Sequence, residues 1–310
     1  MDAVITARDG RLRRRATFVF PASGRLGNQL FQYSAMRAFL SDEQRVILVD
    51  FDDLAATFDG IDAELRSTGV RQDRARLSLL HRARHLVRSP LGLVVQDPAT
   101  HLPRWSVGGS VATVRGYYQR DHDGHAAHVG ALRFRGSVAH AADAFLQDAL
   151  SGHTGRPVAF VHVRRRDYLT HAVGRRIGRD GQEVLGWVED GVPVALPAGW
   201  YLERMEELRD LVPRVRFVLV GDDPVWAAAE LAGPDTLVST LDASADLALM
   251  ARCDAGIVSA SSFAWWGAWF ASRHSDGPFL APLHWLGHAV GEWWPEHVES
   301  SFLTYVGSTR

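Results

Sequence analysis

The chain has 310 residues, of which 46% are hydrophobic and 23% charged, so it can bury one large or two medium globular cores and is not expected to be disordered. Its formal net charge of −2 gives no overall attraction to nucleic acid, and we expect no nucleic-acid partner. All 34 basic residues are arginine, which excludes lysine Schiff bases, pyridoxal-phosphate anchoring and a Walker A loop ending in Gly-Lys-Ser/Thr. A cationic side chain that binds phosphate here is therefore an arginine or, more weakly, a histidine.

The single cysteine and the lack of long apolar runs limit the location of the protein. Cys253 excludes an intrachain disulfide and a thiolate metal cluster, and its apolar neighbours predict a buried thiol. No apolar run reaches the length of a membrane span, and the arginine-rich stretch 11–15 is not followed by a secretory apolar core. We therefore expect a cytoplasmic protein.

The first half of the chain alternates strand and helix patterns. A short apolar strand at 17–20 is followed by a turn, a helix at 28–40 and a second strand at 46–49. The stretch 71–88 predicts a basic helix, and 90–109 is rich in turn residues and remains unassigned. Such alternation is typical of a parallel sheet with crossover helices.

The second half repeats this alternation more clearly. We expect strands at 158–163, 215–220, 255–258 and 278–281, and helices at 201–211, 224–231, 245–252 and 262–271. The fold class is therefore α/β with two Rossmann-like halves, and Ser, Gly, Thr and Pro residues near 151–157 favour domains at 16–152 and 153–300. Ligands of such sheets bind beyond the carboxyl ends of the strands, so the loops that follow strands are the candidate sites.

The first such loop is Gly24-Arg25-Leu26-Gly27-Asn28-Gln29. It lacks the third glycine of a dinucleotide fingerprint. Its small residues would let the backbone approach a diphosphate, with Gly27, Asn28 and Gln29 at the start of a helix that offers N–H donors. An ordinary tight turn with Asn28 as the N-cap explains the same residues.

The second loop follows the strand 158–163 and includes His162, Arg164, Arg165, Arg166 and Asp167. In an extended chain the side chains alternate between two faces, which would separate the arginines. If the strand ends near residue 163 and the chain turns, two or three guanidinium groups can converge on one anion, such as a diphosphate leaving group. The alternative is a solvated arginine run paired with Asp167.

The third loop, 259–262, combines three serines with the start of a helix, where hydroxyl and backbone N–H groups suit phosphate oxygens. Ser261 and Ser262 are therefore candidate donor-binding residues. The tryptophans at 265, 266 and 269 follow with helical spacing, which favours core packing.

The fourth loop is Gly221-Asp222-Asp223-Pro224. The carboxylates of Asp222 and Asp223 suit a guanine edge or a ribose hydroxyl. Asp before Pro is also an ordinary helix start, so this alternative stays open.

A competing site is Asp50-x-Asp52, at the end of the strand 46–49. Two carboxylates and a nucleotide diphosphate would form a hard-oxygen site for a divalent metal. The motif is short, and it makes no use of the arginine loop. We rank it second.

Four segments of the chain resemble motifs known from one enzyme family, in the same order. They read GRLGNQLFQY (24–33), GYYQ (116–119), HVRRxDY (162–168) and SSFxWWGAW (261–269). They are similar to the motifs of the alpha-1,2-fucosyltransferases, which form glycosyltransferase family 11. With Ala281-Pro282 and Trp285 the resemblance spans roughly residues 17–285.

The resemblance implies a GT-B fold, in which two Rossmann-like domains face each other across a cleft. It implies inverting, metal-independent transfer of L-fucose from GDP-fucose to the 2-hydroxyl of a galactoside in a glycan, with no further cofactor. Arg164 and Arg165 match the double arginine that holds the diphosphate. Related enzymes hold the nucleotide with residues that correspond to Asn28, to Asp222 or Asp223, and to Ser261 with Ser262.

Two departures from the family pattern leave the donor sugar open. Arg166 stands where the family usually has glycine, and Ala260 where it usually has asparagine. A different GDP-sugar, or a binder without catalysis, is the alternative function. For the acceptor proton, Asp167 and His162 are the candidate bases. The basic stretch 71–88 fits either a solvated helix or a peripheral contact with the inner membrane face.

Overall fold

The computed structural model describes residues 17–40, 44–69, 91–96, 103–107, 111–151, 155–178 and 181–307. The chain forms two compact units, Met1–Arg135 and Gly136–Arg310. The basic stretch 71–88 lies outside the described residues. In the described part, no helix has the length and apolar character needed to cross a membrane.

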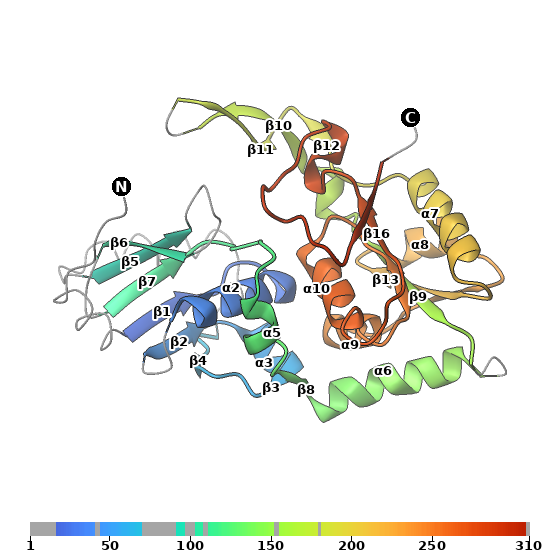
Figure 1. Ribbon diagram of the computed structural model, residues 1–310, viewed down its shortest axis with the longest axis horizontal. Coiled ribbons are helices and arrows are strands. Elements are labelled where there is room, and N and C mark those ends of the chain that lie inside the picture. Colours follow the sequence, from blue (N-terminus) through green and yellow to red (C-terminus); the bar gives the residue numbers. More distant parts are fainter. Residues whose placement is uncertain are drawn as a thin grey trace. The chain divides into compact units, whose positions relative to one another are not determined.

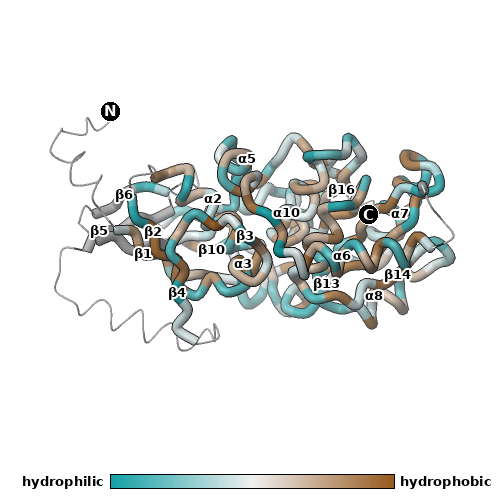
Figure 2. Tube along the Cα trace, turned by 90° about the horizontal axis from the view of Figure 1, so that it is seen from below, coloured by the Kyte–Doolittle hydropathy of each residue, from teal (hydrophilic) through white to brown (hydrophobic). Residues whose placement is uncertain are grey.

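The first unit contains a six-stranded sheet in which β6 is antiparallel to its neighbour and the other pairs are parallel. Its spatial order is β4 (Glu64–Arg66), β2 (Arg45–Val49), β1 (Thr17–Pro21), β7 (Val111–Arg115), β5 (Leu91–Gln96) and β6 (Pro103–Val107). The apolar residues of β2 appear brown in Figure 2. The remaining elements of the unit are α2 (Leu26–Phe39), α3 (Asp52–Thr57), α5 (Gly124–His128) and the ribbon of β3 (Phe58–Asp59) and β8 (Arg133–Phe134).

The second unit contains a fully parallel six-stranded sheet. Its spatial order is β14 (Thr236–Val238), β13 (Arg216–Gly221), β9 (Val158–Val163), β15 (Ala255–Ile257), β16 (Phe279–Pro282) and β17 (Thr304–Val306). Counted along the chain from β9, this is the Rossmann order 3-2-1-4-5-6. The strand order reverses between β9 and β15, so the loops after these two strands border the switch point.

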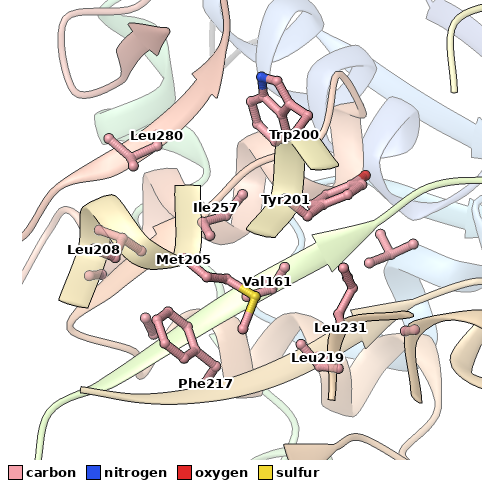
Figure 3. Packing of buried hydrophobic residues seen from close by; sticks show 14 of the residues in the cluster. Val161, Trp200, Tyr201, Met205, Leu208, Phe217, Leu219, Leu231, Ile257 and Leu280 are labelled. Carbon is pink, nitrogen blue, oxygen red and sulfur yellow. The ribbon is translucent and has the colours of Figure 1, made fainter. Parts of the chain in front are cut away.

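Helices cover the sheet of the second unit. They are α6 (Gly136–Ala149), α7 (Ala198–Leu211), α8 (Pro224–Leu231), α9 (Ala243–Met250) and α10 (Ser262–Ala271), with short turns η1 (Asp167–Leu169) and η2 (Leu286–Ala289). All six residues of β9 are buried, as expected for a central parallel strand. Figure 3 shows Met205 and Leu208 of α7 packed over Val161 and Phe217 of the sheet.

A three-stranded antiparallel arm is inserted between β9 and α7 (Figure 1). Its spatial order is β11 (Glu183–Val188), β10 (Ala172–Ile177) and β12 (Val192–Pro193). None of the three strands of this arm was predicted from the sequence. The two units divide before α6, whereas we predicted a domain boundary near 151–157. Helix α6 belongs with the second unit, where its Asp143 pairs with Arg252 just beyond α9.

The predicted α/β class with two Rossmann-like units is confirmed. The strand 158–163 and the helices 224–231 and 262–271 occur at the predicted residues, and the other elements assigned within the described residues agree within three residues at each end. The tryptophans at 265, 266 and 269 and Cys253 are buried as expected, and burial raises the pKa of the Cys253 thiol.

Candidate functional site

The second unit brings three predicted loops together at the carboxyl edge of its sheet. Loop 164–167 follows β9, loop 222–223 follows the adjacent β13, and loop 259–261 follows β15. Two contacts connect the loops on either side of the switch point. The ring of His162 is hydrogen-bonded to the Ser259 hydroxyl (2.8 Å), and the Tyr168 hydroxyl donates to the Ala260 carbonyl (2.9 Å). Ligands of such sheets bind at this switch point.

Arg164 lies at the centre of the charged residues of loops 164–167 and 222–223, which we call the arginine cluster. Its Nη1 is 2.8 Å from Oδ2 of Asp222, and its Nη2 donates to Oδ2 of Asp167 at 2.6 Å. Asp222 is 11% exposed and Asp167 is 38% exposed, so the guanidinium is fixed on its inner side and more accessible on the other. Charge-assisted contacts of this kind fix both direction and position.

Arg165 is held in a different way. Its backbone N–H donates to Oδ1 of Asp222 (2.8 Å), and its guanidinium carbon lies 3.9 Å from the centre of the Trp226 ring. Its Nε is 3.7 Å from Oδ2 of Asp223. Asp222 therefore touches both arginines, while Trp226 supports the second through a cation–π contact.

A tight approach between β9 and β13 makes this arrangement possible. Gly221 ends β13 with φ +154°, and a Cβ there would lie 2.0 Å from the Val163 carbonyl oxygen. Glycine is required at this position because any side chain would collide with the neighbouring backbone. Asp222 emerges directly after it, beside the loop that carries the arginines.

The charges of the cluster balance. Loops 164–167 and 222–223 carry three guanidinium and three carboxylate groups, a formal sum of zero. Arg166 is exposed, and its φ of −29° is not in the left-handed region that favours glycine. An anion here would thus be recognised by oriented N–H donors rather than by excess positive charge.

The remaining predicted residues of this unit differ in accessibility. His162 is buried on the α10 side of the sheet, where its ring lies 5.6 Å from that of Phe263. Ser261 is the N-cap of α10, and its hydroxyl makes no capping hydrogen bond. Ser262, the first residue of α10, is half-buried. Asp223 is the N-cap of α8, and its carboxylate accepts a hydrogen bond from the Trp226 N–H (3.1 Å). This agrees with the alternative in which Asp before Pro begins a helix.

Three residues of this region were missed from the sequence. Tyr201 of α7 is fully buried beside Arg164 and Arg165, and burial raises the pKa of its phenol. Trp226 stands under Arg165. Asp246 of α9 accepts from the Ser239 hydroxyl (2.5 Å), and burial raises the pKa of its carboxyl to about 7. Only the fold reveals them, because aromatic and acidic residues inside helices carry no distinctive spacing.

In the first unit, the glycine loop is held by amide groups. Gly24 has φ +83°, and a Cβ there would meet Nδ2 of Asn28 at 2.3 Å. Asn28 is half-buried, and its Oδ1 accepts from the Gln119 amide at 2.7 Å. Helix α2 begins at Leu26 with Arg25 as the N-cap, so the alternative of Asn28 as the N-cap is wrong.

Two buried glutamines hold this loop from inside. Gln29 donates to the Gly24 carbonyl (3.3 Å) and accepts from the Leu54 N–H (2.9 Å). Gln32 is fully buried, exchanges two hydrogen bonds with the Ser23 backbone and donates to the Gly116 carbonyl (3.0 Å). Gln29 therefore positions the loop, as Gln32 does. Gly27 is buried on the first turn of α2.

The Asp50-x-Asp52 segment is engaged by a neighbouring turn. Both oxygens of Asp50 accept from the Thr68 hydroxyl, and Oδ2 of Asp52 accepts from the Ser67 hydroxyl at 3.3 Å. Within the described ranges, no group of three or more His, Cys, Asp or Glu side chains is arranged to hold a metal ion.

Comparisons with known proteins agree with these observations. A stretch of 131 residues is 28% identical to the O-antigen biosynthesis glycosyltransferase WbnK of Escherichia coli; it covers 41% of this chain and 38% of that relative, so the match spans less than half of either protein. The fold is similar to that of POFUT1 in complex with GDP (TM-score 0.53, 13% identity, 86% of this chain and 99% of that one). It is also similar to that of the fucosyltransferase NodZ from Bradyrhizobium (TM-score 0.51, 13% identity, 82% and 92%).

The family model described as glycosyl transferase family 11 matches residues 132–286, half of the chain. The match includes the arginine loop, the Asp222 loop and the serine loop at the switch point. The family resemblance of the sequence motifs is thereby confirmed, and the chain belongs to glycosyl transferase family 11.

Proposed function

We propose that the protein is an inverting fucosyltransferase that moves L-fucose from GDP-fucose to the 2-hydroxyl of a galactoside in a glycan, without a required metal. The observation that carries the proposal is the pair of arginines oriented by Asp222, which is only 11% exposed, at the switch point. Family membership supports glycosyl transfer. Similar solved structures of POFUT1 are complexes with GDP and with GDP-fucose, which supports this donor.

In the proposed reaction, the acceptor oxygen forms a bond to the anomeric carbon as the bond from that carbon to the β-phosphate oxygen breaks. The electron pair leaves with GDP, and negative charge grows on the diphosphate. Arg164 and Arg165 meet this charge with donors that are already oriented, so little reorganisation is needed. Ser261 and Ser262 at the start of α10 add hydroxyl and backbone N–H groups.

The acceptor hydroxyl must also lose its proton to a base. Asp167 is the better placed of the two candidates, because its side chain is 38% exposed whereas His162 is buried. The ring of His162 is buried and hydrogen-bonded to Ser259, so this residue is better suited to positioning the loops than to acting as the base.

The test is release of GDP from GDP-fucose, with and without lactose, in EDTA. Arg164→Ala is expected to lower the acceptor-stimulated rate by about three orders of magnitude. The matched control is Arg166→Ala, an exposed arginine of the same loop, whose rate should stay within about twofold. Circular dichroism and thermal unfolding verify that both variants fold.

Three other results would change the proposal. A folded Arg164→Ala variant with full activity would refute the diphosphate role. Release from another GDP-sugar, with none from GDP-fucose, would indicate the alternative donor. Thermal stabilisation by GDP without turnover of any GDP-sugar would favour a binder that does not catalyse transfer.

A further inference from the structure

An exposed aromatic surface lies beside the arginine cluster, where the inserted arm meets loop 164–167. Trp187 of β11 has its ring centre 5.1 Å from that of His171 and 6.4 Å from that of Tyr168. We call these three residues the Trp187 platform. Trp187 is 42% exposed, which is unusual for so large an apolar side chain held by other aromatic rings.

The platform is rigidly supported from behind. The Trp187 ring stands edge-on to Trp294, with centres 4.7 Å apart. The Trp294 backbone bonds to His284 and Leu286, and Arg175 of β10 forms an ion pair with Glu292. A rigid aromatic face loses little side-chain entropy when it binds a partner.

Unsatisfied polar atoms lie at the base of the platform. Nδ1 of His171 is 3.8 Å from Oδ2 of Asp167, and among the described residues neither this nitrogen nor Oδ1 of Asp167 has a hydrogen-bond partner. Buried polar atoms usually have partners, and a ligand hydroxyl is one way to supply them. Asp167 also contacts Arg164, so it joins the platform to the proposed diphosphate site.

We infer that the Trp187 platform binds the galactose ring of the acceptor, with a hydroxyl of that ring directed at Asp167 and His171. The inference rests on the proposed function. A β-galactoside has one face made largely of C–H groups, because its axial hydroxyl points to the other face, and such a face stacks on an indole ring. A few convergent polar groups beside an aromatic wall are the usual composition of a small-molecule site.

The same arm offers a matched control. Ile177, at the far end of β10, is 68% exposed and lies opposite Glu183, whereas Trp187 lies opposite Val173. Replacing Ile177 removes a large exposed apolar side chain from the arm without altering the platform. Trp187→Ala and Ile177→Ala therefore differ in whether they remove the stacking surface.

The experiment measures initial rates with methyl β-galactoside as the acceptor and saturating GDP-fucose. Trp187→Ala should raise the acceptor KM about tenfold and leave the KM for GDP-fucose within about twofold. Trp187→Phe, which keeps an aromatic ring, should restore most of the loss, and Ile177→Ala should match the wild type. In parallel, saturation-transfer NMR on the GDP complex should detect methyl β-galactoside with the wild type and lose it with Trp187→Ala.

The outcomes separate this inference from the proposed function. An unchanged acceptor KM and NMR signal in Trp187→Ala, while Arg164→Ala abolishes turnover, would overturn the platform and leave the transferase. Galactoside binding that depends on Trp187, without turnover of any GDP-sugar, would support the platform and overturn the transferase. Absence of any NMR transfer to the galactoside in the wild type would overturn the platform as a galactose subsite.

Discussion

The two units present the same topological feature with different chemistry. In both sheets the strand order reverses beside the first strand, and loops with motif residues follow the strands there. In the first unit neutral amides of Gln29, Gln32 and Gln119 fill the hydrogen bonds of these loops. In the second unit, charged groups meet, and Oδ1 of Asp167 is left without a hydrogen-bond partner among the described residues.

The comparison teaches that a loop after a strand is not a site by position alone. A loop whose polar groups satisfy one another contributes shape, whereas a loop whose charges are oriented but incompletely paired can bind and stabilise a ligand. We therefore expect substitutions of the charged loop residues in the second unit to affect turnover, and substitutions of the glutamines that hold the loops of the first unit to affect folding.

After Arg164→Ala, the largest effect should come from Asp222→Asn. This change keeps the shape but removes the charge that orients Arg164 and contacts the Arg165 N–H. We expect turnover of GDP-fucose to fall about a hundredfold, measured as GDP release, with reduced thermal stabilisation by GDP. Asp210→Asn, on the exposed side of α7, is the control and should be silent.

The matching change in the first unit is Gln32→Leu, which leaves backbone groups of Ser23 and Gly116 without partners. The free energy of unfolding should drop by about 2–3 kcal/mol, measured by urea denaturation. The exposed Gln147 of α6 provides a control through Gln147→Leu. If Gln32→Leu instead kept full stability but lost turnover, the contrast between the two units would fail.

The units should also respond to pH in opposite directions. Burial raises the pKa of Asp246 from 3.8 to about 7, so the stability from this group is complete below about pH 4 and is lost as the pH rises through 7. Burial lowers the pKa of His125 from 6.5 to about 3, so its contribution is complete above pH 6.5 and is lost as the pH falls toward 3. Asp246→Asn should remove the loss of stability that occurs as the pH rises through 7. The unfolding temperature at pH 8 should therefore rise by about 3–6 °C.

The protonation state of His125 can be measured separately. The ring of His125 contacts the Ser34 hydroxyl and the Arg120 carbonyl, which a neutral imidazole satisfies with one donor and one acceptor nitrogen. NMR of the ring carbons should therefore find it neutral at pH 5. Titration of His125 near pH 6.5 in the folded protein would contradict the assignment.

The smallest effect is expected from Asp50→Asn. Asp50 has φ +61°, a conformation that asparagine also tolerates, and its oxygens accept from Thr68. GDP release should stay within about twofold, with or without EDTA. A large loss that Mn²⁺ relieves would instead revive the Asp50-x-Asp52 metal site.

Much of the fold could be predicted because its signals are local. The strand 158–163 is an uninterrupted apolar run, and α8 begins with Pro at its first position after an Asp N-cap. The arm of β10, β11 and β12 was missed because its residues mix arginine, glycine and glutamate with short apolar pairs, so neither the helical nor the strand period is evident.

The site could be predicted only in part, because its contacts depend on which strands are neighbours. The sequence indicated that Arg164 and Asp222 follow strands, but their ion pair depends on β9 lying beside β13, with Val163 opposite Gly221. The platform residue Trp187 and the buried Asp246 lie far from any motif in the sequence. Local patterns do not encode such proximity.

The close approach at Gly221 has a consequence for mutational scanning. In a library that varies every position, substitutions at Gly221 and at Arg164 would abolish activity almost equally often if only activity were measured. A readout of protein abundance would separate them, because a side chain at Gly221 forces apart two central strands while Arg164→Ala leaves the sheet intact. Gly221 would then serve as an internal standard for folding, against which losses of chemistry can be measured.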